Sequence, residues 1–227
     1  MINGLPGNMA SLVEAALANH PQFKVIATSL TGPRKVTQRY NGKTGFKTLF
    51  APPQHYSVIQ ETAKEWPDLI AIDFTQPNGV EENVNLYCSN NIPFIMGTTG
   101  GNRDILPSLV QNSNISAVIA TNMSAPVVML INMFIFAAEN CPNTLKNWEI
   151  QIVESHQAKK EDVSGTALTI GEIMKGLGVK FIGAENIRKI RTELEQILTG
   201  IPKDALGGHG WHKYQLLSPD RNVMLGF

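Results

Sequence analysis

Short continuous apolar runs alternate with segments of helical periodicity over the first 121 residues of the chain. The apolar runs cover residues 69–75, 92–96 and 117–120, and a further short run covers residues 23–27. Continuous apolar runs are typical of parallel strands that are buried on both faces. The helical segments between them complete repeated strand–helix units. We therefore predict an α/β domain over residues 1–121, with a Rossmann-type parallel sheet.

The pattern changes after residue 121. It predicts a long apolar helix at 127–139, a half-buried strand at 148–153, a helix at 164–177 and a hairpin of strands at 213–217 and 223–227. We expect residues 122–227 to form an α+β domain with an open mixed sheet. The first strand is nearly absent, and the chain stops within the hairpin, so we expect the sequence to be a fragment.

Composition limits the class of protein. Hydrophobic residues make up 43% and charged residues 17% of the 227 residues, as in soluble globular proteins. The formal net charge is zero, so no global field favours nucleic acid or an anionic membrane, and we expect neither partner. No apolar run reaches spanning length and no signal or transit peptide is visible, so we expect a cytoplasmic protein. Its two cysteines suggest a reducing compartment, and we expect both thiols to be buried.

The first candidate site is the turn Gly4-Leu5-Pro6-Gly7-Asn8-Met9, which precedes an apolar helix. Such glycines let a pyrophosphate approach the backbone at the amino end of a helix in dinucleotide-binding folds. The same residues are also ordinary turn chemistry. Arg34 and Lys35 follow the predicted second strand and would suit the 2′-phosphate of NADPH, but a solvated basic loop explains them equally well.

Two more candidate segments follow predicted strands. Asp73-Phe74-Thr75 and Gly97-Thr98-Thr99 lie where parallel strands end, and ligands bind at the carboxyl ends of strands in open α/β sheets. Glycines in such places also simply form turns.

The most informative stretch is 154–167. A loop with His156, Lys159 and Lys160 leads into a helix whose first turn is Ser164-Gly165-Thr166. The amino end of a helix presents unpaired N–H groups and binds anions, so these residues form a candidate carboxylate or phosphate clamp. Alternatively, Ser164 only caps the helix and the lysines are solvated.

In this order, these motifs resemble the dihydrodipicolinate reductase family, the NAD(P)H-dependent enzymes of lysine biosynthesis. The stretch 154–167 is similar to the family signature Glu-x-His-(His or Gln)-x-x-Lys-x-Asp followed by Ser-Gly-Thr-Ala. Gln157 in place of a second histidine, Gly97 to Asp104 and Gly207 to His212 are similar to the plant-type branch. The family normally ends with a return of the chain to the cofactor domain, which we expect to be missing here.

The resemblance implies reduction of 4-hydroxy-tetrahydrodipicolinate or dihydrodipicolinate to tetrahydrodipicolinate in the diaminopimelate route, without a metal. It implies that Lys160 or His156 donates the proton, with Lys160 favoured and Lys159 within reach. Gln157, Ser164, Gly165 and Thr166 would bind the dicarboxylate substrate. NADPH, or alternatively NADH, would be bound by a further group: Gly4, Leu5, Pro6, Gly7, Asn8, Met9, Arg34, Lys35, Phe74, Gly97, Thr98, Thr99, Asn122 and Met123.

Family analogy also implies a homodimer or homotetramer, and a plastid location if an upstream transit segment is missing. One alternative is a catalytically silent homologue that binds a dinucleotide or serves in assembly. Another is a different two-domain NAD(P) oxidoreductase, which would not be expected to carry the arrangement from His156 to Thr166.

We interpret His209 and His212 as structural or rim residues, because exposed histidines usually have no assigned role.

Overall fold

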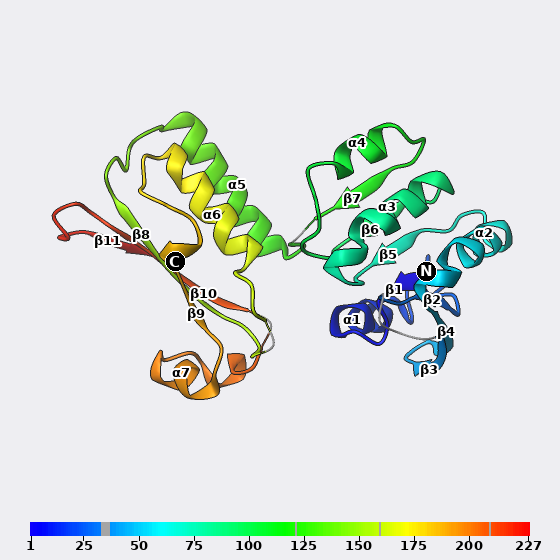
Figure 1. Cartoon of the computed structure of the whole chain (residues 1–227). Helices are drawn as coiled ribbons and strands as arrows, with labels where there is room; N and C mark the ends of the chain where they lie inside the picture. Colours follow the sequence, from blue (N-terminus) through cyan, green and yellow to red (C-terminus); the bar gives the residue numbers. More distant parts are fainter. Residues whose placement is uncertain (33–36, 121, 159, 209) are drawn as a thin grey trace. The chain divides into compact units, whose positions relative to one another are not determined.

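The computed structural model describes residues 1–32, 37–120, 122–158, 160–208 and 210–227. The chain folds into two compact units, Met1–Thr121 and Asn122–Phe227 (Figure 1). The first unit is an α/β domain and the second is an α+β domain, as the sequence pattern predicts.

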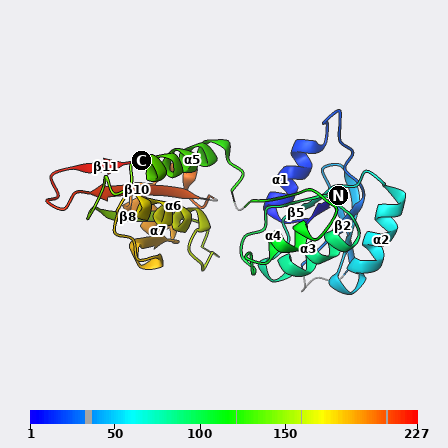
Figure 2. The ribbon, with the colours of Figure 1, turned by 90° about the horizontal axis from the view of Figure 1, so that it is seen from above.

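The first unit is built on a parallel sheet with strand order β1-β5-β6-β7. Its strands are β1 (Ile2–Asn3), β5 (Ala71–Asp73), β6 (Phe94–Met96) and β7 (Ala117–Ile119). The helices of this unit are α1 (Asn8–Leu17), α2 (His55–Glu65), α3 (Val80–Ser89) and α4 (Leu106–Gln111), and Figure 2 shows them around the sheet. The predicted parallel sheet is therefore confirmed, with strands shorter than the apolar runs that predicted them.

The sequence pattern missed a second sheet in this unit. Strands β2 (Thr28–Leu30), β4 (Gly45–Phe50) and β3 (Gln38–Gly42) form it in that order. The strand that we expected at 23–27 lies instead at 28–30, and residues 38–50, for which the pattern predicts no element, form the β3–β4 hairpin.

Glu14 of α1 explains why a polar segment folds against the core. Its buried carboxylate accepts hydrogen bonds from the amides of Lys43 and Thr44 and lies 3.6 Å from the Lys47 ammonium. Burial alone would raise the pKa of Glu14, but the hydrogen bonds and Lys47 outweigh it and lower the pKa. This long-range interaction leaves no periodic signal in the sequence.

The second unit has a mixed sheet with order β11-β10-β8-β9, in which only β8 and β9 are parallel. Helices α5 and α6 lie side by side (Figure 1). Their apolar side chains pack with Ile150, Ile152 and Tyr214 of the sheet. Strand β9 and helix α7 were not predicted. The elements are α5 (Ala125–Asn140), β8 (Glu149–Ser155), α6 (Gly165–Gly176), β9 (Ile187–Ile190), α7 (Glu193–Leu198), β10 (Trp211–Leu217) and β11 (Met224–Gly226).

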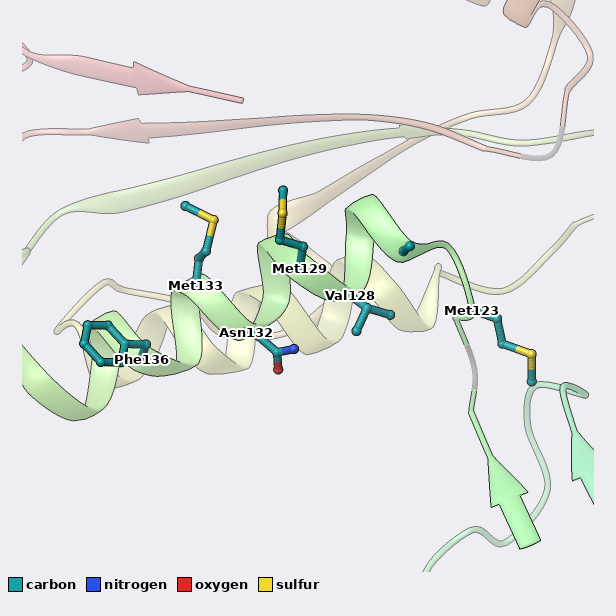
Figure 3. Close-up of a pocket in the computed structure, with 7 residues that line it drawn as sticks. Met123, Val128, Met129, Asn132, Met133 and Phe136 are labelled. Atoms are coloured by element: carbon teal, nitrogen blue, oxygen red, sulfur yellow. The ribbon is translucent and has the colours of Figure 1, made fainter.

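One side of α5 carries large apolar side chains that are 39–67% exposed. An open hollow of about 850 Å³ is lined by Val128, Met129, Asn132, Met133 and Phe136, and Figure 3 shows these side chains projecting from successive turns.

Within the described ranges, no helix is both long enough and apolar enough to cross a bilayer. The expectation of two buried thiols is wrong, since Cys88 is half-buried and Cys141 is exposed.

We predict that Tyr87→Phe destabilises the first unit. The buried Tyr87 hydroxyl donates to Asp73 Oδ2 at 2.6 Å and accepts from Asn3 Nδ2 at 2.8 Å, so its removal leaves two buried groups short of a partner. The expected loss is about 1–3 kcal/mol in the free energy of unfolding, measured by chemical denaturation. Tyr56→Phe, at an exposed position of α2, is the matched control and should change little.

Candidate active site

Three of the predicted cofactor-binding residues meet in the first unit. Gly4 has φ +98°, and a Cβ there would lie 2.3 Å from the carbonyl oxygen of Phe74. A Cβ on Gly97 would lie 2.2 Å from the Phe74 ring. The loops after β1, β5 and β6 can therefore approach one another only because glycine stands at both positions. This is the edge of a parallel sheet where nucleotides bind.

The other predicted cofactor residues of this unit differ in exposure. The Leu5 side chain is buried in an apolar cluster with Ile2, Ala10 and Leu49, so only its backbone is available to a ligand. Pro6, Gly7, Asn8, Met9 and Thr99 are exposed. Asn8 begins α1, whose amino end is suited to a pyrophosphate. Arg34 and Lys35 lie outside the described residues.

Asp73 connects these loops. Its buried carboxylate accepts hydrogen bonds from the Thr75 amide at 2.9 Å, the Thr98 hydroxyl at 3.1 Å and the Tyr87 hydroxyl at 2.6 Å. The buried Thr98 hydroxyl therefore holds the loop after β6 against Asp73. Burial and the Asp73 charge hold the pKa of Tyr87 well above its usual range, so the phenol keeps its proton as a donor.

In the second unit, the fully buried Glu154 organises the stretch that the sequence singled out. Its Oε2 accepts a hydrogen bond from the Ser164 amide at 2.8 Å, and its Oε1 lies 2.5 Å from Arg191 Nη2. The same guanidinium donates to the carbonyls of Lys160 and Asp162, at 2.7 and 3.1 Å. One ion pair thus holds both the loop and the start of α6 against β8. Arg191 belongs to no local motif, so the sequence does not predict its place in the site.

The amino end of α6 offers backbone donors that an anion can bind. Ser164 is the N-cap residue, and its amide is occupied by Glu154. The amides of Gly165 and Thr166 make no hydrogen bond to protein within the described part of the chain. Asn122 Nδ2 donates to Thr166 Oγ1 at 3.1 Å and so links a predicted cofactor residue to a predicted substrate residue. Met123 is exposed beside it in the sequence.

Lys160 lies on the same loop. Its Nζ is 2.8 Å from Asp162 Oδ1, and its side chain is 23% exposed whereas that of Asp162 is 73% exposed. The hydrogen bond from Lys160 lowers the pKa of Asp162. Lys159 is outside the described residues. Gln157 accepts a hydrogen bond at its carbonyl from the Lys160 amide at 3.0 Å, which closes a turn of the loop.

The sequence predicts a structural or rim role for His212, but the structure places this residue beside His156. His156 Nε2 lies 3.2 Å from His212 Nε2, and His212 Nδ1 lies 2.8 Å from the Tyr214 hydroxyl. Strand β10 pairs with β8 in the register that sets His212 opposite Glu154. Burial, followed by the charge of His156, lowers the pKa of His212 to about 4. The signal in the sequence was weak, because only the strand register brings His212 to the site.

Glu154, His156 and His212 each offer a ligand atom within 4.8 Å of the others. Both carboxylate oxygens of Glu154 are already bonded, however, and the Arg191 guanidinium on Oε1 opposes a second cation. The arrangement is better suited to an anionic substrate, whose charge Lys160 and the amino end of α6 can partly compensate.

Comparison with known proteins gives consistent matches over both units. The family model described as dihydrodipicolinate reductase, N-terminus, matches residues 1–123, and that for the C-terminus matches residues 129–210. A probable 4-hydroxy-tetrahydrodipicolinate reductase 1, chloroplastic, from Oryza sativa is 39% identical over 78% of this chain and 51% of its own length. The 4-hydroxy-tetrahydrodipicolinate reductase 1, chloroplastic, from Arabidopsis thaliana is 33% identical over 100% of this chain and 65% of its own length.

Among solved structures, a dipicolinate-bound dihydrodipicolinate reductase from Paenisporosarcina sp. TG-14 shares the fold. It has a TM-score of 0.59 and 18% identity, with 99% of this chain and 84% of that chain covered. The chain spans about half to two thirds of the length of the two curated plant relatives.

We predict that Arg191→Leu is strongly destabilising, because it leaves the Glu154 carboxylate buried without its counter-ion. Breaking a buried pair from one side typically costs about 3–5 kcal/mol. Chemical denaturation of the variant measures this loss. The control is Arg221→Leu, whose pair with Glu149 is exposed and should contribute less than about 1 kcal/mol. Equal losses in the two variants would mean that Glu154 does not depend on Arg191.

We predict that His212 makes the fold sensitive to acid. The unfolded chain binds a proton at this position below the ordinary pKa of 6.5, whereas the folded chain binds it only near pH 4. The free energy of unfolding should therefore fall as the pH drops through this window, by at most about 1.4 kcal/mol per unit. In denaturation experiments from pH 7 to 4.5, the free energy of unfolding should decrease less in His212→Gln than in the parent chain. In the control His20→Gln, at an exposed position, it should decrease as much as in the parent chain.

Proposed function

The chain belongs to the dihydrodipicolinate reductase family, and we propose that it reduces 4-hydroxy-tetrahydrodipicolinate, or dihydrodipicolinate, to tetrahydrodipicolinate with NAD(P)H. The observation that carries this proposal is the Glu154–Arg191 pair. It fixes the Lys160 loop and the amino end of α6 on one strand end. A reaction on a small dicarboxylate needs this combination of an anion site and a nearby proton donor.

In this proposal, each candidate substrate-binding residue of the second unit has a role. The amides of Gly165 and Thr166 bind one substrate carboxylate, with the Ser164 and Thr166 hydroxyls beside it. Gln157 orients the substrate from the loop, and Asn122 keeps Thr166 in place through its 3.1 Å hydrogen bond. Because the net charge of the chain is zero, attraction of the dianion depends on these local groups.

The first unit would hold the cofactor. A reduced nicotinamide cofactor, when bound, would supply a hydride to the unsaturated ring of the substrate. Gly97, Thr98 and Thr99, with Phe74 packed beneath Gly97, form the loop for the nicotinamide. Gly4 to Met9 form the turn for the pyrophosphate. Arg34 and Lys35 would favour NADPH over NADH by binding the 2′-phosphate.

Lys160 is the proton donor in this proposal. Its ammonium is held at 2.8 Å by Asp162, an exposed residue that can release it when the substrate enters. Hydride addition leaves a carbanion-like centre on the substrate, and an ammonium within hydrogen-bond reach is a competent acid. His156 then binds and orients the substrate. The presence of Lys160, His156 and the α6 amino end together argues against the silent homologue.

We further propose a homodimer or homotetramer. For compartment, the chloroplastic relatives from Oryza sativa and Arabidopsis thaliana support a plastid over the cytoplasm.

We predict that Lys160→Ala lowers kcat by about 10²–10⁴-fold, as expected for the loss of a positioned acid. Cofactor affinity should stay within a factor of about two, since Lys160 belongs to the substrate unit. Turnover is measured as NADPH oxidation with enzymatically generated substrate, and affinity by fluorescence titration. Lys175→Ala in α6, an exposed lysine paired with Glu172, is the control. Parallel losses of turnover and cofactor affinity would contradict the role of Lys160.

A further inference from the structure

We propose that Tyr214 and His212 fix the tautomer of His156, so that neutral His156 accepts a hydrogen bond at Nε2 and presents its proton on Nδ1. The inference rests on the proposed function and assigns a positioning role to two residues outside the stretch 154–167. It follows from two distances and one buried hydroxyl.

The direction of the network is set by Tyr214. This residue is 4% exposed, its ring stacks on Phe227 with centroids 4.9 Å apart, and it packs with Ile150 and Leu216. Within the described residues, His212 Nδ1 at 2.8 Å is the one polar partner of its hydroxyl. A buried O–H needs an acceptor, whereas a phenol oxygen tolerates the lack of a donor better. Burial also raises the pKa of Tyr214, so the hydroxyl keeps its proton. Tyr214 therefore donates to His212 Nδ1.

The position of the proton on His212 determines its position on His156. A neutral histidine that accepts at Nδ1 carries its proton on Nε2. His212 Nε2 lies 3.2 Å from His156 Nε2, and the two rings meet at 71°. His212 is therefore the donor and His156 Nε2 is the acceptor. Neutral His156 must then carry its proton on Nδ1.

The same geometry opposes a positive charge on His156. A proton on His156 Nε2 would face the N–H of His212 across 3.2 Å. To remove this conflict, His212 would have to move its proton to Nδ1 and the Tyr214 hydroxyl would have to turn away. Among the described residues, the charges that act on His212 besides His156 are those of Glu154 on β8, Arg191 after β9 and Lys160 on the loop. Neutral His156 then serves as a hydrogen-bond donor to the substrate, and proton transfer is left to Lys160.

The first test reads the tautomers directly and needs no activity. Long-range ¹H–¹⁵N spectra of the ¹⁵N-labelled chain distinguish protonated from unprotonated imidazole nitrogens, and His156→Gln and His212→Gln assign the signals. We expect an unprotonated Nδ1 in His212 and an unprotonated Nε2 in His156. In Tyr214→Phe, both patterns should move toward a mixture of tautomers. A protonated Nδ1 in His212 of the parent chain, or spectra unchanged by Tyr214→Phe, would overturn the inference.

The second test reads the consequence for catalysis. Tyr214→Phe keeps the ring and its stacking, so we expect kcat/KM to fall about tenfold on the acid side, with the acid limb of the profile moved to higher pH. His212→Gln can place an N–H near the position of Nε2, so its kcat/KM profile should keep the acid limb of the parent chain. His212→Leu has no such donor, and its profile should not keep that limb. Tyr56→Phe, exposed on α2, is the control.

The outcomes separate the two proposals. If the tautomer signals are as expected but no variant or parent chain oxidises NADPH, the proposed function fails and the hydrogen-bond network stands. If activity is present but His212→Gln and His212→Leu behave alike, His212 acts only through packing and the inference fails. Thermal unfolding of each variant identifies losses of activity that come from loss of fold.

Discussion

A carboxylate with no contact to solvent stays charged only when donors surround it. Glu154 meets that condition through the Ser164 amide and the Arg191 guanidinium, and both bonds have structural consequences. The first orients the start of α6, and the second brings a residue 37 positions further along the chain onto the loop that carries Lys160. If the pair is broken, the loop and the helix end lose their common support.

Asp73 has the same role in the first unit. It is buried at the end of β5 and accepts hydrogen bonds from groups that belong to two loops and to α3. In both units, then, a buried carboxylate at a strand end connects several backbone segments through hydrogen bonds. The donors that satisfy it come from the very segments that would contact a ligand, so the stability and the shape of each site depend on the same bonds.

The local electrostatics of the second unit are consistent with an anionic substrate. The chain has no net charge, so attraction of a dianion depends on short-range groups rather than on a field around the whole protein. Arg191, Lys160 and the amino end of α6 lie near one another through Glu154, whose charge is largely compensated by Arg191. The site keeps two positive sources, Lys160 and the helix end, for a ligand. His156 adds one donor, Nδ1, which carries its proton because of the hydrogen bonds from Tyr214 to His212 and from His212 to His156.

Local pattern alone determined the parallel sheet of the first unit, α5 and α6, and the loop from Glu154 to the first turn of α6. These features are encoded by neighbouring residues, since periodicity and helix capping act over a few positions. Only the tertiary structure decided the β2-β4-β3 sheet, held to α1 by Glu14, and the meetings of Glu154 with Arg191 and of His156 with His212. His156 and His212 are 56 positions apart, and the register of β10 on β8 brings them together. Strand register depends on how whole faces pack, so no short stretch of sequence specifies it.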